Sequence, residues 1–429
     1  MRILILHRVP YPKIEYHRGI DHDRHDVTYF GTAGALATLP DGLRCARVER
    51  PGTAAPYDEA VAWLDGLAEP PRFDRIISMS EYELLDAARL RERLGVPGAP
   101  VERVLLSRDK VLMKQAVEKA GLRVPRFLPL TEFLAADGKA GWTGPTVLKP
   151  HRGASSVDVV VFGSAEEAYT SVSGRRSGVA ELDGEAQAEA AGDFEVEEFV
   201  SGPVLHFDGL VENGRVLALT ASEYLGTCLA YAQGLPMGSF QIDLADGIAA
   251  WVDEVLRAVR IEEGSFHLEG IRDDGGTGEL VFLEVGNRVG GADVAATFEL
   301  RTGVHLPSWE LRVLLGEEVA GRLPAAPPDA GYYGWFVHPG HHLAPGTFEG
   351  FDGAEPFRTD PRALTWQELA PGAPLPGHVT YGAYETPLAG IAATASPEET
   401  RDFMAGLFQA LRLRTSAPRD TQETQGVQA

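Results

Sequence analysis

The chain has 429 residues and a formal net charge of −23, with 44% hydrophobic and 24% charged residues. A chain of this length can bury a sizeable core and exceeds one ordinary domain, so we expect two or three packed domains. Its acidic residues are spread along the chain without a basic block, which argues against a nucleic acid partner. The two cysteines cannot form a disulfide framework, and no apolar run reaches the roughly 18 residues that span a bilayer. We therefore expect a cytoplasmic protein with no membrane partner.

The first hundred residues alternate between expected strands and an expected helix. Residues 2–6 and 75–79 are apolar runs typical of buried strands, and residues 80–94 have a helical pattern. This alternation predicts an α/β domain with a parallel sheet. The segment after the first strand reads HRVPYPK, which lacks the glycine-rich turn of a dinucleotide-binding domain, and the chain contains no P-loop sequence.

The next hundred residues predict a connecting helix and a small α+β lid. Residues 107–120 carry a helical apolar stripe, with Ser107 as the expected N-cap and Gly121 as the stop. The lid is expected to contain three strands and one helix. The strands are predicted over residues 146–149, 157–162 and 194–200, and the helix around residues 165–172.

The remainder predicts two hairpins and a polar tail. The first hairpin is expected over residues 205–220, with a turn at 212–214, and a helix is expected near residues 248–259. The second hairpin is expected over residues 266–285. Residues 416–429, SAPRDTQETQGVQA, form a mainly polar tail that is expected to be disordered.

The second hairpin contains the sharpest chemical signal of the sequence. If it is symmetric about the turn-rich run at 273–278, Glu269 and Glu284 lie directly opposite each other. Like charges at such positions destabilise a strand pair, so a positive group should lie between them. Two carboxylates without a committed histidine or thiol suit a hard cation such as Mg²⁺, which fills its remaining positions with phosphates and water. Two exposed acids on a solvated strand pair are the alternative, but the flanking Phe266 and Phe282 favour a partly buried site.

From residue 107 to residue 306 the order of the motifs resembles that of the ATP-grasp superfamily. The motif RDK at 108–110, the stretch from Gly121 to Pro125 and the strand PTVLKP at 145–150 are similar to successive parts of that family. The Gly/Ser loop at 151–156 and the strand EVEEFV at 195–200 follow in the same order. The pairing of Glu284 and Arg288 with two glycines is similar to the L-amino-acid ligase branch. The resemblance implies an ATP-grasp fold of mixed α/β and α+β class, with an N-terminal α/β domain at 1–106, a linker helix and lid at 107–200, and a C-terminal antiparallel-sheet domain at 201–415.

The resemblance also implies roles for individual residues. Lys110 and Lys149 would bind the phosphates of ATP, and Arg288 would steady the transferred phosphate together with Lys149 as the catalytic groups. The metal, Mg²⁺ or Mn²⁺, would be bound by Glu269 and Glu284. The remaining nucleotide contacts would come from the loop hydroxyls and from the strand that reads the adenine, namely Ser155, Ser156, Glu197, Glu198, Phe199 and Val200.

Two departures from the family pattern affect the expected site. Where many members have a ribose-binding glutamate, this chain has Pro203, so the ribose contact would fall to Asp208 or His206, for which a cross-strand structural role is an equal alternative. Where many members read Glu-x-Asn-x-Arg, this chain has Glu284-Val285-Gly286-Asn287-Arg288, with the asparagine one position late. Asn287 is retained as a third candidate metal ligand.

The function that the resemblance implies is the formation of an amide or peptide bond. A carboxylate would attack the γ-phosphate of ATP, and an amine would displace phosphate from the resulting acyl phosphate, with both substrates small molecules and a homodimer as a family-level expectation. An ATP-dependent carboxylase similar to biotin carboxylase, and a nucleotide-binding regulatory module without catalysis, are the alternatives. His267 and Arg301 are candidate substrate contacts. A transition-metal site at His338, His341 and His342 is disfavoured, since a short histidine-rich loop is more often surface.

Overall fold

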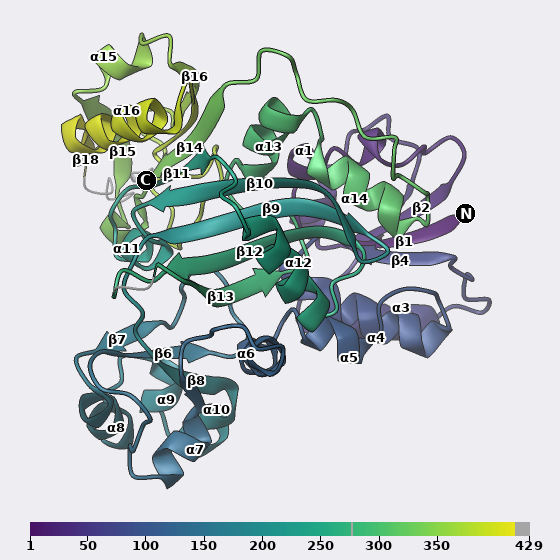
Figure 1. Cartoon of the computed structure of the whole chain (residues 1–429). Coiled ribbons are helices and arrows are strands. Elements are labelled where there is room, and N and C mark those ends of the chain that lie inside the picture. Colours follow the sequence, from purple (N-terminus) through teal and green to yellow (C-terminus); the bar gives the residue numbers. More distant parts are fainter. Residues whose placement is uncertain (276–277, 417–429) are drawn as a thin grey trace, which may run out of the picture. The chain divides into compact units, whose positions relative to one another are not determined.

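The computed structural model describes residues 1–275 and 278–416, and the chain forms two compact units (Figure 1). The first unit contains Met1–Glu223, Ile242–Gly290 and Val294–Ala330, and the second contains Tyr224–Gln241, Gly291–Asp293 and the chain from Gly331 onwards. Residues of the expected C-terminal domain therefore occur in both units. Among the described residues, no helix combines the length and apolar character that crossing a membrane requires.

The N-terminal part of the first unit is a parallel sheet, as the sequence predicted. Its strand order is β3-β2-β1-β4, and β1 pairs in parallel with both β2 and β4. Strand β1 is buried almost throughout because helices cover both faces of the sheet, which is why it reads as a continuous apolar run. The strands are β1 (Arg2–Leu6), β2 (Asp26–Gly31), β3 (Ala46–Glu49) and β4 (Arg75–Ser78), and the helices are α1 (Tyr11–Ile14), α2 (Ala33–Leu36), α3 (Pro56–Asp65), α4 (Leu84–Leu94) and α5 (Val101–Leu105).

The connecting helix is α6 (Lys110–Lys119), and its N-cap differs from the prediction. Asp109 is the N-cap, because its carboxylate accepts hydrogen bonds from the backbone N–H groups of Val111 and Leu112. Ser107, the predicted cap, instead donates its hydroxyl to the carbonyl of Val104 at the end of α5. The expected cap at Ser107 is therefore wrong by two residues.

The lid is a four-stranded antiparallel sheet with short helices on one face. Its strand order is β5-β8-β6-β7, and its apolar face packs against α7 and α8. Strand β7 begins at Val160 and not at residue 157, because Ser155, Ser156 and Asp158 have positive φ angles that an extended strand excludes. The elements are β5 (Phe127–Pro129), α7 (Leu130–Ala135), β6 (Thr146–Pro150), β7 (Val160–Phe162), α8 (Ala165–Ser173), α9 (Ala180–Asp183), α10 (Gln187–Ala190) and β8 (Phe194–Glu198).

Both predicted hairpins belong to the antiparallel strand set β13-β12-β9-β10 of the first unit. Successive residues of a strand face opposite sides. One side carries Phe207, Leu268 and Val285 and packs against α12, whose label lies over these strands in Figure 1. The other side carries the polar residues His206, Asp208, His267 and Glu269 and, further along β9, Leu210, which packs against α13 and α14. The elements are β9 (Val204–Glu212), β10 (Arg215–Leu225), α12 (Ile248–Ala258), β12 (Gly264–Arg272), β13 (Leu280–Gly286), α13 (Val294–Thr302) and α14 (Leu306–Leu314).

The second unit is built on the antiparallel strand set β11-β14-β17-β16, against which α16 packs. A separate pair, β15 and β18, ends at Ser416, so the first residue of the tail predicted to be disordered belongs to a strand. The rest of that tail lies outside the described residues. The elements are α11 (Cys228–Ala232), β11 (Met237–Ile242), β14 (Tyr332–His338), β15 (Thr347–Asp352), α15 (Glu355–Arg358), β16 (Ala363–Glu368), β17 (Leu388–Thr394), α16 (Pro397–Ala410) and β18 (Arg412–Ser416).

Candidate active site

The polar side of strands β9, β12 and β13 carries a row of ionisable residues. His206 on β9 is aligned with Glu269 on β12, and Glu269 is aligned with Glu284 on β13. One step along, Asp208 on β9 is aligned with His267 on β12. Because aligned residues of neighbouring strands share a face, all five side chains project to the same side of the sheet.

The predicted register of the second hairpin is confirmed, because Glu269 and Glu284 are direct cross-strand partners. Each carboxylate has a basic group beside it. The ammonium of Lys110 lies 3.2 Å from Glu284 Oε2, and Nε2 of His267 lies 3.2 Å from Glu269 Oε1. The two acids therefore occupy a place where positive charge is required, which fits the oxygen-rich environment that Mg²⁺ prefers.

Lys110 is placed by the first turn of α6. Its backbone N–H donates to the carbonyl of His151, and its ammonium donates to the carbonyl of Gly153 at 3.0 Å. Lys110 therefore connects Glu284 with the Gly/Ser loop of the lid. Within that loop Ser155 and Ser156 have φ angles of 61° and 55°, a left-handed conformation that residues other than glycine adopt rarely.

Lys149 on β6 lies on the polar face of the lid sheet, beside two buried glutamates of β8. Its ammonium is 2.6 Å from Glu197 Oε1 and 3.9 Å from Glu195 Oε1. Burial opposes the charge of Lys149, but Glu197 and Glu195 outweigh it and raise the pKa, and Glu284 contributes in the same direction. The contribution of Glu284 shows that the lysine of the lid and the acidic hairpin share one electrostatic environment.

The sequence analysis missed Lys114 as a member of this group. Its ammonium lies 2.5 Å from Glu197 Oε2 and 2.7 Å from Glu195 Oε2, and the residue is fully buried. Lys114 lies one helical turn after Lys110 and within the apolar stripe of the helix, and this spacing could have identified it as a buried lysine on the same face.

The expected adenine-binding segment follows Glu197 at the end of β8. Glu198 is engaged by Arg126, and the N–H of Phe199 donates to the carbonyl of Pro145. The N–H of Val200 has no hydrogen-bond partner within the described part of the chain, and the ring of Phe199 is 48% exposed. The segment therefore retains an apolar ring and a backbone donor at its exposed end.

Arg288 is held by an acidic residue that the sequence analysis did not single out. Its Nε donates to Glu81 Oε2 at 2.7 Å, and Arg108 binds the other oxygen of Glu81. Burial would raise the pKa of Glu81, but the charges of Arg288 and Arg108 outweigh it and lower the pKa to about 2. Lys110 lowers it further, so Lys110 and Arg288 lie near the same carboxylate.

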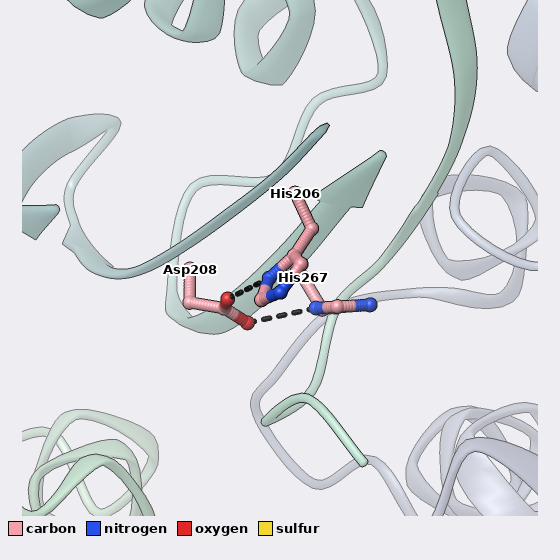
Figure 2. Close-up of side chains that lie close together, drawn as sticks. All are labelled: His206, Asp208 and His267. Atoms are coloured by element: carbon pink, nitrogen blue, oxygen red, sulfur yellow. Dashed lines mark hydrogen bonds and ion pairs between the residues drawn. The ribbon is translucent and has the colours of Figure 1, made fainter. Parts of the chain in front are cut away.

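Asp208 lies between two histidines (Figure 2). Its Oδ2 accepts from Nδ1 of His206 at 2.6 Å, and its Oδ1 accepts from Nδ1 of His267 at 2.7 Å. Burial opposes the charge of His267, but Asp208 and Glu269 outweigh it and raise the pKa to about 9. Both oxygens of Asp208 are engaged, so the geometry supports its role in orienting the histidines more directly than a ribose contact.

The structure also shows the surroundings of the remaining candidate residues, which are Asn287, Arg301 and the histidines between residues 338 and 342. The amide nitrogen of Asn287 donates to the carbonyls of Glu263 and Ser265, which holds its side chain at the start of β12, four residues along the strand from Glu269. Arg301 on α13 donates to the carbonyl of Ala330. The rings of His341 and His342 lie 5.8 Å apart, but the ligating atoms of His338, His341 and His342 do not come together as a metal-binding group. Across residues 1–275 and 278–416, the group that combines metal-ligating atoms within reach of one another is His206, Asp208 and His267.

Comparison with curated proteins identifies two relatives that are ligases, while no protein-family profile matches the chain. The L-arginine-specific L-amino acid ligase of Bacillus subtilis is 29% identical over 246 residues, which are 56% of this chain and 56% of that protein. The alanine–anticapsin ligase of Bacillus subtilis (strain 168) is 34% identical over 116 residues, or 26% and 24% of the two chains. The chain thus spans about half the length of the first relative and about a quarter of the second.

Comparison with solved structures extends over nearly the whole chain. The L-amino acid ligase from Bacillus licheniformis has a TM-score of 0.67 and 21% identity, with 96% of this chain and 98% of that chain covered. A biotin carboxylase domain of Hydrogenobacter thermophilus, solved with MgADP and bicarbonate, has a TM-score of 0.63 and 15% identity, with 97% and 91% covered. At these identities the likeness concerns the fold. The resemblance indicated by the motifs is confirmed at that level: the chain has the ATP-grasp fold.

Proposed function

We propose that the chain is an ATP-dependent ligase that activates a carboxylate as an acyl phosphate and joins it to an amine, with release of ADP and phosphate. The observation that carries this proposal is the convergence of Lys110 on Glu284, which stands directly opposite Glu269. The charges of Lys149 and Arg288 act on the same group of residues. Three cations around a carboxylate pair suit a polyphosphate bound with a divalent metal.

The nucleotide would be bound between the lid and the acidic hairpin. Lys110 and Lys149 would neutralise its phosphates, and Ser155 and Ser156 would cover them. The adenine would be read by the segment Glu198–Val200, whose exposed Phe199 and backbone N–H are suited to an aromatic base with polar edges. Glu197, whose two oxygens bind Lys149 and Lys114, would border the adenine without contacting it through its carboxylate. Asp208 would contact the ribose by exchanging one of its two histidine hydrogen bonds for one from a ribose hydroxyl.

Glu269, Glu284 and Asn287 would hold Mg²⁺ or Mn²⁺. The cross-strand carboxylate pair fits such a cation, because two acids that face each other need positive charge beside them, as Lys110 and His267 already provide. When bound, the metal would supply neutralisation of the phosphate oxygens during transfer.

The catalytic contribution of the protein is positioning and charge stabilisation. Arg288 would bind the phosphate that is transferred, a task suited to a guanidinium held in one orientation by Glu81. Lys149 would stabilise the negative charge of the phosphates beside Arg288. The loop at residues 151–156 would exclude water from the acyl phosphate, which hydrolyses readily.

The names of the relatives support an amino acid or a similar small carboxylate as the substrate, and His267 and Arg301 are the proposed contacts for it. The proposal includes the domain division 1–106, 107–200 and 201–415, a cytoplasmic location and a homodimer.

The test is to incubate the purified protein with Mg²⁺, ATP and pools of amino acids while measuring phosphate, ADP and AMP. The proposal expects ADP and phosphate with particular pools, together with a new amide product detected by mass spectrometry. Glu284→Gln should abolish turnover, whereas Glu254→Gln, at an exposed position of α12, should leave it unchanged. Formation of AMP and pyrophosphate would contradict the acyl-phosphate route. Turnover that requires bicarbonate and no amino acid would favour a carboxylase, and ATP binding without turnover would favour a regulatory module.

A further inference from the structure

Four charged side chains are enclosed together between α6 and the polar face of the lid sheet. Lys114 and Glu195 are fully buried, and Glu197 and Lys149 are only 3% and 5% exposed. Glu195 and Glu197 alternate along β8 and therefore project to the same face, where Lys149 is aligned with Glu195 on the neighbouring strand β6. Two carboxylates and two ammonium groups make this cluster neutral as a whole.

The two lysines differ in how firmly they are held. Lys114 makes close contacts with both acids, at 2.5 Å and 2.7 Å, and the ring of Phe127 lies 4.5 Å from its ammonium. Lys149 makes one close contact, with Glu197, and stands 3.9 Å from Glu195. Lys114 is thus fixed within the cluster, whereas Lys149 can leave it by breaking a single ion pair.

Departure of Lys149 would be costly without Lys114. Both carboxylate oxygens of Glu195 are buried without a hydrogen bond from any described residue, so ammonium charge is their compensation. Uncompensated buried carboxylates are strongly destabilising. If Lys114 were neutral, Lys149 would be the one cation for two buried acids and would be retained by both.

We propose that Lys114 is a positioning residue that keeps Glu195 and Glu197 compensated, so that the ammonium of Lys149 is available to the phosphates of the nucleotide. The inference rests on the proposed function, because it requires Lys149 to bind nucleotide phosphate. In this role Lys114 touches no substrate and acts only through the charge balance of the cluster.

The test is the affinity of the full-length protein for MgADP, measured by isothermal titration calorimetry. Lys114→Met should weaken binding by about tenfold or more, because Lys149 then remains with the two carboxylates. The double variant Lys114→Met/Glu195→Gln removes one charge of each sign and should recover binding to within about threefold of the unmodified protein. Lys119→Met, at an exposed position of the same helix, is the matched control and should bind as the unmodified protein does.

If Lys114 had a purely structural role, Lys114→Met would lower the melting temperature, but MgADP affinity would not be lost in the single variant and recovered in the double variant. The inference is overturned if Lys114→Met binds MgADP normally, or if the double variant binds as weakly as the single one. If Lys114→Met does not fold, Glu195→Gln alone decides, since it should bind MgADP as well as the unmodified protein or better. A tenfold loss in Glu195→Gln would contradict the inference. If the unmodified protein does not bind MgADP, the proposed function is wrong and the inference falls with it.

Discussion

At the scale of single residues, burial determines which side chains can ionise. His7 follows β1 and is fully buried, with its ring nitrogens hydrogen-bonded to the hydroxyl of Tyr16 and to the carbonyl of Ala35. Burial lowers its pKa to about 4, partly offset by the bond to Ala35. His7 is therefore neutral in the folded protein at pH values where an unfolded histidine already binds a proton.

This shift predicts a pH dependence of stability. Because the folded pKa lies below the unfolded value, the unfolded state takes up the proton first, and stability is lost as the pH falls from about 6.5 to about 4. His7→Gln should reduce the slope of the unfolding free energy against pH in this window by up to about 1.4 kcal/mol per pH unit. Urea unfolding of both proteins at pH 7 and pH 5 gives the change in unfolding free energy over this window. Equal slopes for the variant and the unmodified protein would contradict the assignment.

Gly290 leaves no room for a side chain beside the two-histidine cluster. A Cβ at this position would lie 2.8 Å from Asp208 Oδ1 and 2.9 Å from His267 Nδ1. Gly290→Ala should therefore displace the hydrogen bond between these residues and destabilise the fold by roughly 1–3 kcal/mol. Turnover should fall more than MgADP affinity. At Gly291 a Cβ would meet nothing within 4 Å, so Gly291→Ala is the control, and an equal effect of both substitutions would contradict the explanation.

At the scale of elements, α6 carries both Lys110 and Lys114, so its first turn sets the geometry of two cationic groups. Asp109 caps this helix, and its carboxylate also lies 3.6 Å from Arg152 in the Gly/Ser loop. The cap thus connects the start of the helix with the loop that is proposed to cover the phosphates.

Asp109→Ala removes this cap and should cost about 1 kcal/mol of stability. Because Lys110 is the first residue of the helix, MgADP binding should weaken as well. Asp109→Asn keeps a capping side chain and should retain most of the stability. Thermal melts and calorimetry on the two variants separate the effects, and unchanged MgADP affinity in Asp109→Ala would show that the cap does not position Lys110.

At the scale of the whole molecule, Glu81 joins segments that are remote in sequence. It follows β4 of the N-terminal sheet and binds Arg108, which precedes α6, and Arg288, which lies 207 residues away after β13. The catalytic guanidinium proposed here is therefore oriented by the N-terminal part of the chain.

Glu81→Gln should leave two guanidinium groups without their shared carboxylate. We expect a loss of stability on the order of 2 kcal/mol and a fall in kcat of about tenfold or more, with MgADP affinity largely retained. Glu118→Gln, at an exposed position of α6, is the matched control. A normal kcat for Glu81→Gln would show that Arg288 does not depend on this contact.

Features that depend on short segments could be predicted from the amino-acid sequence. The parallel strands, the helix at α6 and the direct pairing of Glu269 with Glu284 follow from apolar runs, helical spacing and a hairpin turn, which are local properties of the chain. The order of the motifs was sufficient to indicate the ATP-grasp fold. A local signal also misled in one place, since Ser107 has the residue type of a cap but its hydroxyl serves α5.

Contacts between side chains that are remote in sequence became known from the folded structure. Lys114 and Glu197 are separated by 83 residues, His267 and Asp208 by 59, and Arg288 and Glu81 by 207. No periodicity relates such positions, because each contact depends on how one element packs against another. Burial then determines their charge, since a carboxylate removed from water remains ionised only where packing brings a cation to it. For this reason Lys110 and Lys149 could be proposed from the sequence as nucleotide contacts, whereas the residues that hold them and Arg288 in place emerged from the fold.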